Sequence, residues 1–121
     1  VVLARSDEAS RADWLATADV VCSMTRAHTE GLPVLEAMAA GKPILASLTD
    51  RHREILQHGT EGELLLADDP ESWAHSLVRL SRQPGRAQAY GAAARLASAR
   101  YASSAMAAEL MGVYRTIASR G

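Results

Sequence analysis

Four short apolar runs, separated by segments long enough for helices, are the feature that most limits how this chain can fold. They cover residues 1–4, 19–23, 43–47 and 63–66. The two central runs are continuously apolar rather than alternating, as in strands that are covered on both faces. Strands that alternate with helices are typical of a parallel sheet. We therefore predict an α/β fold with a parallel sheet of about four strands.

Helices are predicted between the strands and throughout the last third of the chain. The linking helices are expected at residues 11–17, 32–40 and 52–58. Gly41 and Gly59 follow the last two of these helices, and each is predicted to form a left-handed C-terminal cap. Asp69 is predicted to cap a helix that begins at Pro70 and continues to residue 82. Pro84 and Gly85 end that helix, and two Ala-rich helices at about 86–100 and 103–119 follow. The C-terminal portion is therefore predicted to be all-helical.

Charge and composition exclude several classes of function. The formal net charge is −1, without a basic stripe that would attract polyanions, so we predict no nucleic-acid partner. The single cysteine, Cys22, lies in an apolar run and is predicted to be a small core residue in a reducing compartment. No apolar run approaches the roughly 20 residues that span a bilayer, so we expect a cytoplasmic protein. Asp68 and Asp69 precede Pro70 and are predicted to serve as a helix cap rather than a metal site.

The segment from His28 to Pro43 is the most informative part of the chain. It places polar residues and Gly31 directly between a buried strand and a helix start. Ligands of open α/β sheets bind at the carboxyl ends of strands, where helix N-termini favour anions. A phosphate therefore fits at Gly31 and Leu32, and Glu36, one turn further on, can accept two hydroxyl hydrogen bonds from a ribose. The same pattern also fits plain helix capping, with Glu30 and Glu36 complementing the helix dipole and His28 solvated.

This segment resembles the Glu-x7-Glu region of the family 4 glycosyltransferases, which are retaining enzymes of the GT-B fold. The usual form of that region is E-G-F-G-L-P-V-L-E-A-M-A-x-G-x-P-V-V-A. The sequence matches it without gaps at Ala18-Asp19, from Gly31 through Ala39, and at Gly41. The resemblance extends more weakly over nearly the whole chain. It implies that residues 1–121 form part of a Rossmann-like, nucleotide-sugar-binding domain.

The resemblance assigns roles to individual residues. Glu36 matches the second Glu of the motif and is expected to bind the ribose, and the backbone at Gly31 and Leu32 is expected to lie against the diphosphate and donor sugar. His28 stands where the family has its first Glu, so we assign it the catalytic-site contact to the sugar hydroxyls. It can donate or accept a hydrogen bond there, but it brings no fixed negative charge.

Two positions leave alternatives open. A gapped register makes Glu30 the first acid, because the run Thr29-Glu30-Gly31-Leu32-Pro33 is also common in the family. Further on, the family often has a Gly-Gly pair whose amides approach the donor, and this chain has Asp50-Arg51 instead. Arg51 either replaces those amide contacts with a cation or is simply solvated.

The function implied is the donor-binding portion of a glycosyltransferase that uses a nucleotide-diphosphate sugar and a glycan or lipid-linked acceptor, with retention. The resemblance implies no metal and no cofactor besides the donor. It leaves open a peripheral association of the full-length protein with the inner face of the membrane. The alternatives are a non-catalytic GT-B-like partner or scaffold and, third, a nucleotide-sugar epimerase.

The beginning of the chain indicates an N-terminal truncation. The sequence has no initiator Met and opens directly on the apolar run at residues 1–4. The family's acceptor-binding N-terminal domain and its Arg or Lys pair for the diphosphate would precede this run. We therefore expect the 121 residues alone to be inactive. We also expect residues 1–4 either to pair with residues 19–23 or to lie unpaired.

Overall fold

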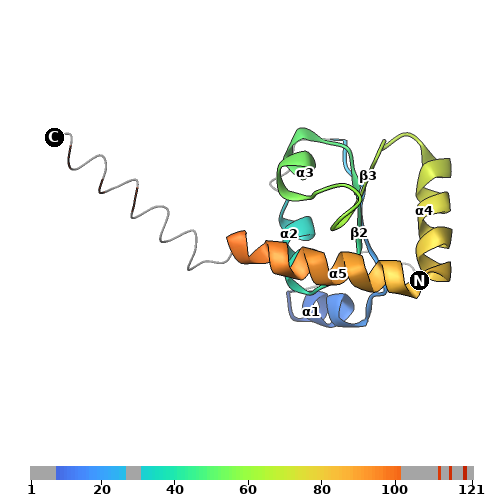
Figure 1. Cartoon of the computed structure of the whole chain (residues 1–121), viewed down its shortest axis with the longest axis horizontal. Helices are drawn as coiled ribbons and strands as arrows, with labels where there is room; N and C mark the ends of the chain where they lie inside the picture. Colours follow the sequence, from blue (N-terminus) through green and yellow to red (C-terminus); the bar gives the residue numbers. More distant parts are fainter. Residues whose placement is uncertain (1–7, 27–30, 102–111, 113–114, 116–118, 120–121) are drawn as a thin grey trace.

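The computed structural model describes residues 8–26 and 31–101, together with 112, 115 and 119 (Figure 1). Helices and strands alternate up to residue 65, and helices follow. In chain order the elements are α1 (Glu8–Thr17), β1 (Val21–Ser23), α2 (Leu32–Ala39), β2 (Ile44–Ser47), α3 (Asp50–Ile55), β3 (Gly62–Leu65), α4 (Pro70–Arg82), α5 (Pro84–Ser98) and a short 3₁₀ turn (Ala99–Tyr101).

The three strands form one parallel sheet in the order β1-β2-β3. Val21 lies beside Ile44, and Ile44 lies beside Gly62. The predicted α/β architecture with a parallel sheet is therefore confirmed. The fourth expected strand, at residues 1–4, lies outside the described residues, and so does its expected pairing with residues 19–23.

Helices cover both faces of the sheet, with α4 on one side and α2 and α3 on the other (Figure 1). Ile44 and Ala46 of β2 face a core built from α2, α3 and α5, whereas Leu45 faces a second core with Trp73, Leu80 and Tyr90. All four residues of β2 are buried. The prediction of strands covered on both faces is therefore confirmed for β2 and wrong for β1, in which no residue is fully buried.

The prediction that Cys22 is a core residue is wrong, because its side chain is exposed. Cys22 lies beside Leu45 in the sheet and so points to the same face. The apolar cluster around Leu45 includes Val20 but does not extend over Cys22 at the edge of the described sheet. Desolvation by neighbouring atoms raises the pKa of the thiol. A raised pKa reduces the thiolate fraction, so Cys22 is not primed as a nucleophile.

The caps explain where α2 and α3 begin and end. Gly41 has a left-handed backbone with φ of 69° and donates its N–H to the carbonyl of Met38 at 3.0 Å, as the predicted cap of α2 requires. α3 begins two residues earlier than predicted, because the hydroxyl oxygen of Thr49 accepts the N–H of His52 at 3.1 Å. It also ends earlier, at Ile55, so Gly59 with φ of 81° turns a loop instead of capping the helix.

The start of α4 and the break before α5 follow the predicted signals. The Asp69 carboxylate accepts hydrogen bonds from the Ser72 N–H and hydroxyl, and these lower the pKa of Asp69. Pro70 opens α4, and Pro84 opens α5 directly after it. The last predicted helix, at about 103–119, lies almost entirely outside the described residues. Within the described part of the chain, no helix is both long and apolar enough to cross a bilayer.

Candidate functional site

The carboxyl ends of β1 and β2 place two loops and two helix starts at one edge of the sheet. β1 ends at Ser23 and is followed by α2, while β2 ends at Ser47 and is followed by α3. Because both strands run parallel, these helix starts lie at the same edge. This is the edge at which the sequence predicts a phosphate.

Gly31 opens α2 in a left-handed conformation, with φ of 74° and ψ of 15°. Its carbonyl accepts the N–H of Leu35 at 3.0 Å, which begins the helix. Having no side chain, Gly31 places nothing over the first N–H groups of α2. N–H groups at a helix start favour anions, so this geometry agrees with the predicted phosphate position, which itself stays a prediction.

Gly31 is buried against α3. A Cβ built at Gly31 would lie 2.7 Å from Cδ1 of Ile55 and 3.4 Å from Cγ of Arg51. The structure therefore brings Gly31 and Arg51 together, although 20 residues separate them in the sequence. Arg51 also forms an ion pair with Glu54 at 3.1 Å, and its side chain is 39% exposed. The guanidinium is thus held beside the start of α2 while remaining open to solvent.

Glu36 lies in α2, one turn after Leu32, and is half-buried. Its contact with a ribose stays a prediction. The other predicted site residues, His28, Thr29 and Glu30, lie outside the described residues. The choice between His28 and Glu30 as the residue that meets the sugar is therefore open.

Four large apolar side chains are exposed around this edge. Met24, Leu48 and Leu66 each directly follow a strand, and Leu32 is the first residue of α2. The exposed fraction is 64% for Met24, 45% for Leu48, 56% for Leu66 and 52% for Leu32. The predicted phosphate site thus has an apolar rim, defined here by these four residues.

A family model described as "Glycosyl transferases group 1" matches residues 2–83, which include all three strands and α1 to α4. The chain belongs to the group 1 glycosyltransferase family. The matched region contains Gly31, Leu32, Glu36 and Arg51, as well as His28, Thr29 and Glu30. The resemblance drawn from the sequence is confirmed.

Relatives of this group 1 glycosyltransferase chain include two that are 38% identical to it. A phosphatidyl-myo-inositol mannosyltransferase of Mycobacterium leprae matches over 98% of the chain and 32% of its own length. A D-inositol 3-phosphate glycosyltransferase of Thermobispora bispora matches over 85% of the chain and 24% of its own length. The chain therefore spans about a third of the first relative and about a quarter of the second.

Solved structures show the same fold. Sucrose-phosphate synthase from Thermosynechococcus elongatus superposes with a TM-score of 0.87 at 23% identity, over 98% of this chain and 30% of that one. HepE of Anabaena, solved in complex with UDP and glucose, superposes with a TM-score of 0.75 at 22% identity, over 87% of this chain and 28% of that one. These similarities confirm the predicted GT-B-type α/β fold of this group 1 glycosyltransferase chain.

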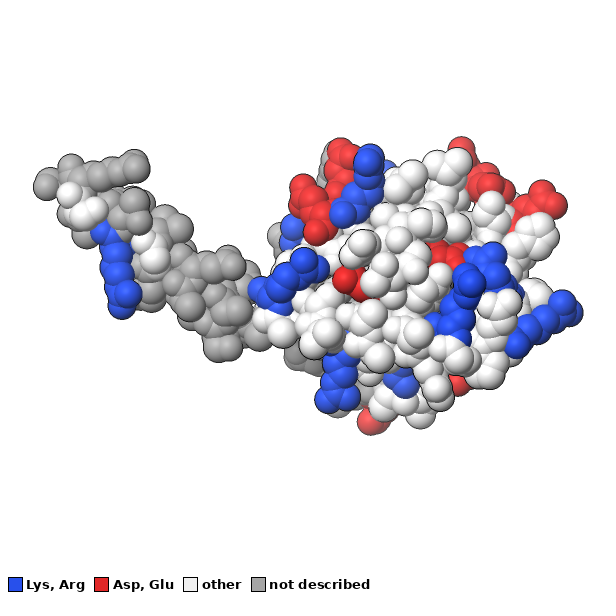
Figure 2. All heavy atoms as spheres, viewed as in Figure 1, with Lys and Arg blue, Asp and Glu red and all other residues white. Residues whose placement is uncertain are grey.

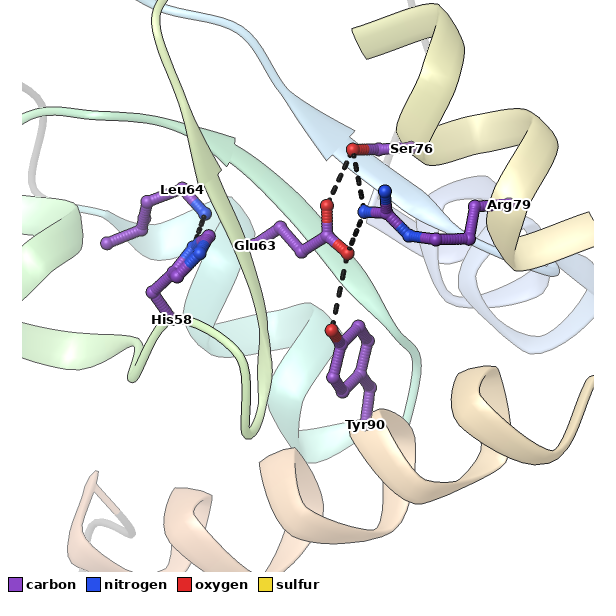
Figure 3. A network of polar contacts seen from close by, with 6 residues as sticks. All are labelled: His58, Glu63, Leu64, Ser76, Arg79 and Tyr90. Carbon is purple, nitrogen blue, oxygen red and sulfur yellow. Dashed lines mark hydrogen bonds and ion pairs between the residues drawn. The ribbon is translucent and has the colours of Figure 1, made fainter. Parts of the chain in front are cut away.

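A second polar cluster, centred on Glu63 of β3, was missed by the sequence analysis (Figure 3). Its buried carboxylate accepts hydrogen bonds from the Ser76 hydroxyl at 2.5 Å, from Nη2 of Arg79 at 2.5 Å and from the Tyr90 hydroxyl at 3.2 Å. Burial alone would raise the pKa of Glu63. The hydrogen bonds from Ser76, Arg79 and Tyr90 and the charge of Arg79 outweigh burial and lower that pKa. The cluster therefore ties β3 to α4 and α5.

His58 bonds to β3 along the strand edge that does not pair with β2. Its Nδ1 accepts the backbone N–H of Leu64 at 2.9 Å (Figure 3). Because β3 is an edge strand of the described sheet, this bond occupies a group that would otherwise be open to pairing with another chain. We interpret His58 as an edge-protecting residue of the group 1 glycosyltransferase chain.

Two cavities lie away from the predicted site. One of about 510 Å³ lies at the amino ends of β1 and β2, beside Val20, Pro43 and Leu80. The other, of about 520 Å³, lies beside Glu63 and Arg79. Neither is lined by a predicted site residue. In open α/β sheets ligands bind at the carboxyl edge, so the start of α2 is kept as the candidate site in preference to either cavity.

Charged side chains of both signs are mixed on the surface. On the face in Figure 2, basic and acidic groups surround a mostly uncharged centre, and the described residues form no basic stripe on that face. The described ranges also contain no group of three or more His, Cys, Asp and Glu side chains that could hold a metal ion.

Replacing Gly31 with Ala is expected to destabilise the chain by about 2–3 kcal/mol, combining left-handed strain with overpacking against Ile55. Gly59→Ala is the matched control. Gly59 has a similar φ of 81°, but a Cβ there meets no atom of the described residues within 4 Å. It should therefore cost only the backbone term of about 1 kcal/mol. Urea denaturation of both variants measures the difference, and equal losses would show that Gly31 does not pack on α3.

Proposed function

We propose that this chain forms the donor-binding part of a retaining glycosyltransferase. The reaction transfers a sugar from a nucleotide-diphosphate sugar to a glycan or lipid-linked acceptor. The observation that carries the proposal is the left-handed Gly31 at the start of α2, held against Arg51 of α3 within the family's motif.

Each group has a part in the chemistry. The start of α2 offers N–H groups and a positive dipole end to the diphosphate, and Arg51 adds a cation beside it. Glu36 accepts hydrogen bonds from the ribose, and Thr29 with either His28 or Glu30 meets the transferred sugar. These contacts bind the donor and orient its anomeric carbon toward the acceptor.

Retaining transfer develops positive charge at the sugar and negative charge on the departing diphosphate. One helix start and one arginine offset only part of that charge. We therefore expect turnover to need more of the relatives' length than this chain spans, including the family's upstream Arg or Lys pair.

The relatives favour a lipid-linked acceptor, because one of them is named for transfer of mannose to phosphatidyl-myo-inositol. Such an acceptor would place the reaction at a membrane surface, and we propose the inner face. We propose that the apolar rim of Met24, Leu32, Leu48 and Leu66 is the surface that contacts the acceptor-binding part.

The test uses the protein made from the intact gene, incubated with UDP-, GDP- and ADP-linked glucose and mannose. We expect one of these donors to release its nucleoside diphosphate, and NMR of the product to show the retained anomeric configuration. Donor binding without any transfer would replace the proposal with the non-catalytic partner. Conversion of the donor to its epimer would replace it with the epimerase, and a complete absence of binding would reject the donor site.

A further inference from the structure

Ser47, the last residue of β2, is fully buried and joins two neighbouring segments. Its hydroxyl oxygen accepts the backbone N–H of Thr25 at 3.0 Å and donates to the carbonyl of Ser23 at 3.3 Å. Ser23 ends β1, and Thr25 lies on the segment that leads from β1 to Gly31. One hydroxyl therefore fixes the point at which the chain leaves β1.

The carbonyl of Ser47 holds the next helix. It accepts a hydrogen bond from Nδ1 of His52 at 2.7 Å, which places a proton on that nitrogen. His52 is fully buried in α3, and among the described residues its Nε2 has no hydrogen-bond partner. Burial of an unsatisfied ring nitrogen costs free energy, and the bond to Ser47 spares Nδ1 that cost. The first turn of α3 is thus held to the end of β2.

The two connections meet at the proposed donor site. α3 carries Arg51, whose side chain lies against Gly31, and Thr25 begins the segment that ends at Gly31. Ser47 is therefore bonded to both sides of the site, through its hydroxyl on one side and its carbonyl on the other. The residue is fully buried, so its hydroxyl is not open to a donor bound at the surface.

We propose that Ser47, together with His52, is a positioning residue for the nucleotide-sugar site. It ties Thr25, just after β1, to the start of α3, and so helps to hold Arg51 beside Gly31. The inference rests on the proposed function and names a residue of that site that the motif does not include.

The test compares Ser47→Ala with Ser47→Thr, which keeps the hydroxyl, and with Ser76→Ala as a matched control. Ser76 is also a buried serine with hydrogen bonds, but it lies in the Glu63 cluster, away from the site. In the protein made from the intact gene, Ser47→Ala should raise the donor KM roughly tenfold. This is the change expected when the free energy of about one hydrogen bond no longer helps to position the site. Ser47→Thr should restore most of the affinity, and Ser76→Ala should lower the melting temperature without changing KM.

If Ser47→Ala raises the donor KM no more than Ser76→Ala does, the inference is overturned and the proposed function stands. A wild-type protein that binds none of the six nucleotide sugars would instead reject the proposed function, and the inference with it. Should Ser47→Ala yield no folded protein, His52→Leu tests the other half of the role. It removes the bond between the Ser47 carbonyl and α3 and leaves the hydroxyl bonds to Thr25 and Ser23. His52→Asn keeps a hydrogen-bond donor at the Nδ1 position and should leave the donor KM near the wild-type value. Equal KM values for His52→Leu and His52→Asn would contradict the positioning role of this bond.

Discussion

Glu36→Ala is expected to weaken binding of the nucleotide sugar by about 10²- to 10⁴-fold in the protein made from the intact gene. The carboxylate is assigned two charge-assisted hydrogen bonds to the ribose, each about 1.5–3 kcal/mol, and alanine makes neither. Alanine also favours a helix more than glutamate does, so α2 should keep its stability. Isothermal titration calorimetry with the donor that gives turnover measures the change.

The matched control for Glu36 is Glu71→Ala. Glu71 is an exposed acid in the first turn of α4 and lies outside the motif. We expect its loss to leave donor affinity within about twofold of the wild-type value. Wild-type affinity in Glu36→Ala would remove the ribose assignment. The alternative of a first-turn acid that complements the helix dipole is wrong for Glu36, because α2 has no acid in its first turn.

Glu63→Leu is expected to lower the free energy of unfolding by about 2–4 kcal/mol, as loss of one member of a buried charged cluster does. The substitution leaves the buried hydroxyls of Ser76 and Tyr90 and the guanidinium of Arg79 without their shared acceptor. The Arg79 side chain is 38% exposed, so its guanidinium can bond to water instead. The loss of unfolding free energy should therefore be smaller than for a fully buried pair. Urea denaturation measures it, and a loss below about 0.5 kcal/mol would contradict a structural role for the cluster.

Acid should destabilise the chain partly through the same carboxylate. The pKa of Glu63 is lower in the folded state than its ordinary value, so its contribution to stability is present above the unfolded pKa, near 4.3. That contribution is lost as the pH falls through the folded pKa. In a pH series below about 5, the wild-type chain should therefore lose more stability than Glu63→Leu. Parallel pH profiles would show that Glu63 does not titrate as its contacts imply.

Local signals in the sequence predict most of the elements. Gly41 ends α2 and Pro70 begins α4 where the sequence places them, because caps and breakers act through a few neighbouring residues. α3 begins two residues earlier than the sequence predicts because the hydroxyl of Thr49 caps it. Such errors change the ends of an element and not its presence.

Contacts between distant residues lie beyond this kind of prediction. Glu63 meets Arg79 and Tyr90 across 16 and 27 residues, and no periodicity relates these positions. The exposure of Cys22 depends on where the core beside Leu45 ends, which is a property of packing rather than of the apolar run. At the candidate site the motif pointed to Gly31 and Glu36, but the contact of Gly31 with Arg51 and the bonds of Ser47 needed the folded chain.

A crystal structure of the protein made from the intact gene, with the donor's nucleoside diphosphate bound, tests the central claim most directly. We predict the diphosphate at the start of α2, against the backbone of Gly31 and Leu32 and beside Arg51, with the Glu36 carboxylate within hydrogen-bond distance of the ribose hydroxyls. A nucleotide bound instead at the amino edge of the sheet, in the cavity beside Val20 and Pro43, would contradict it.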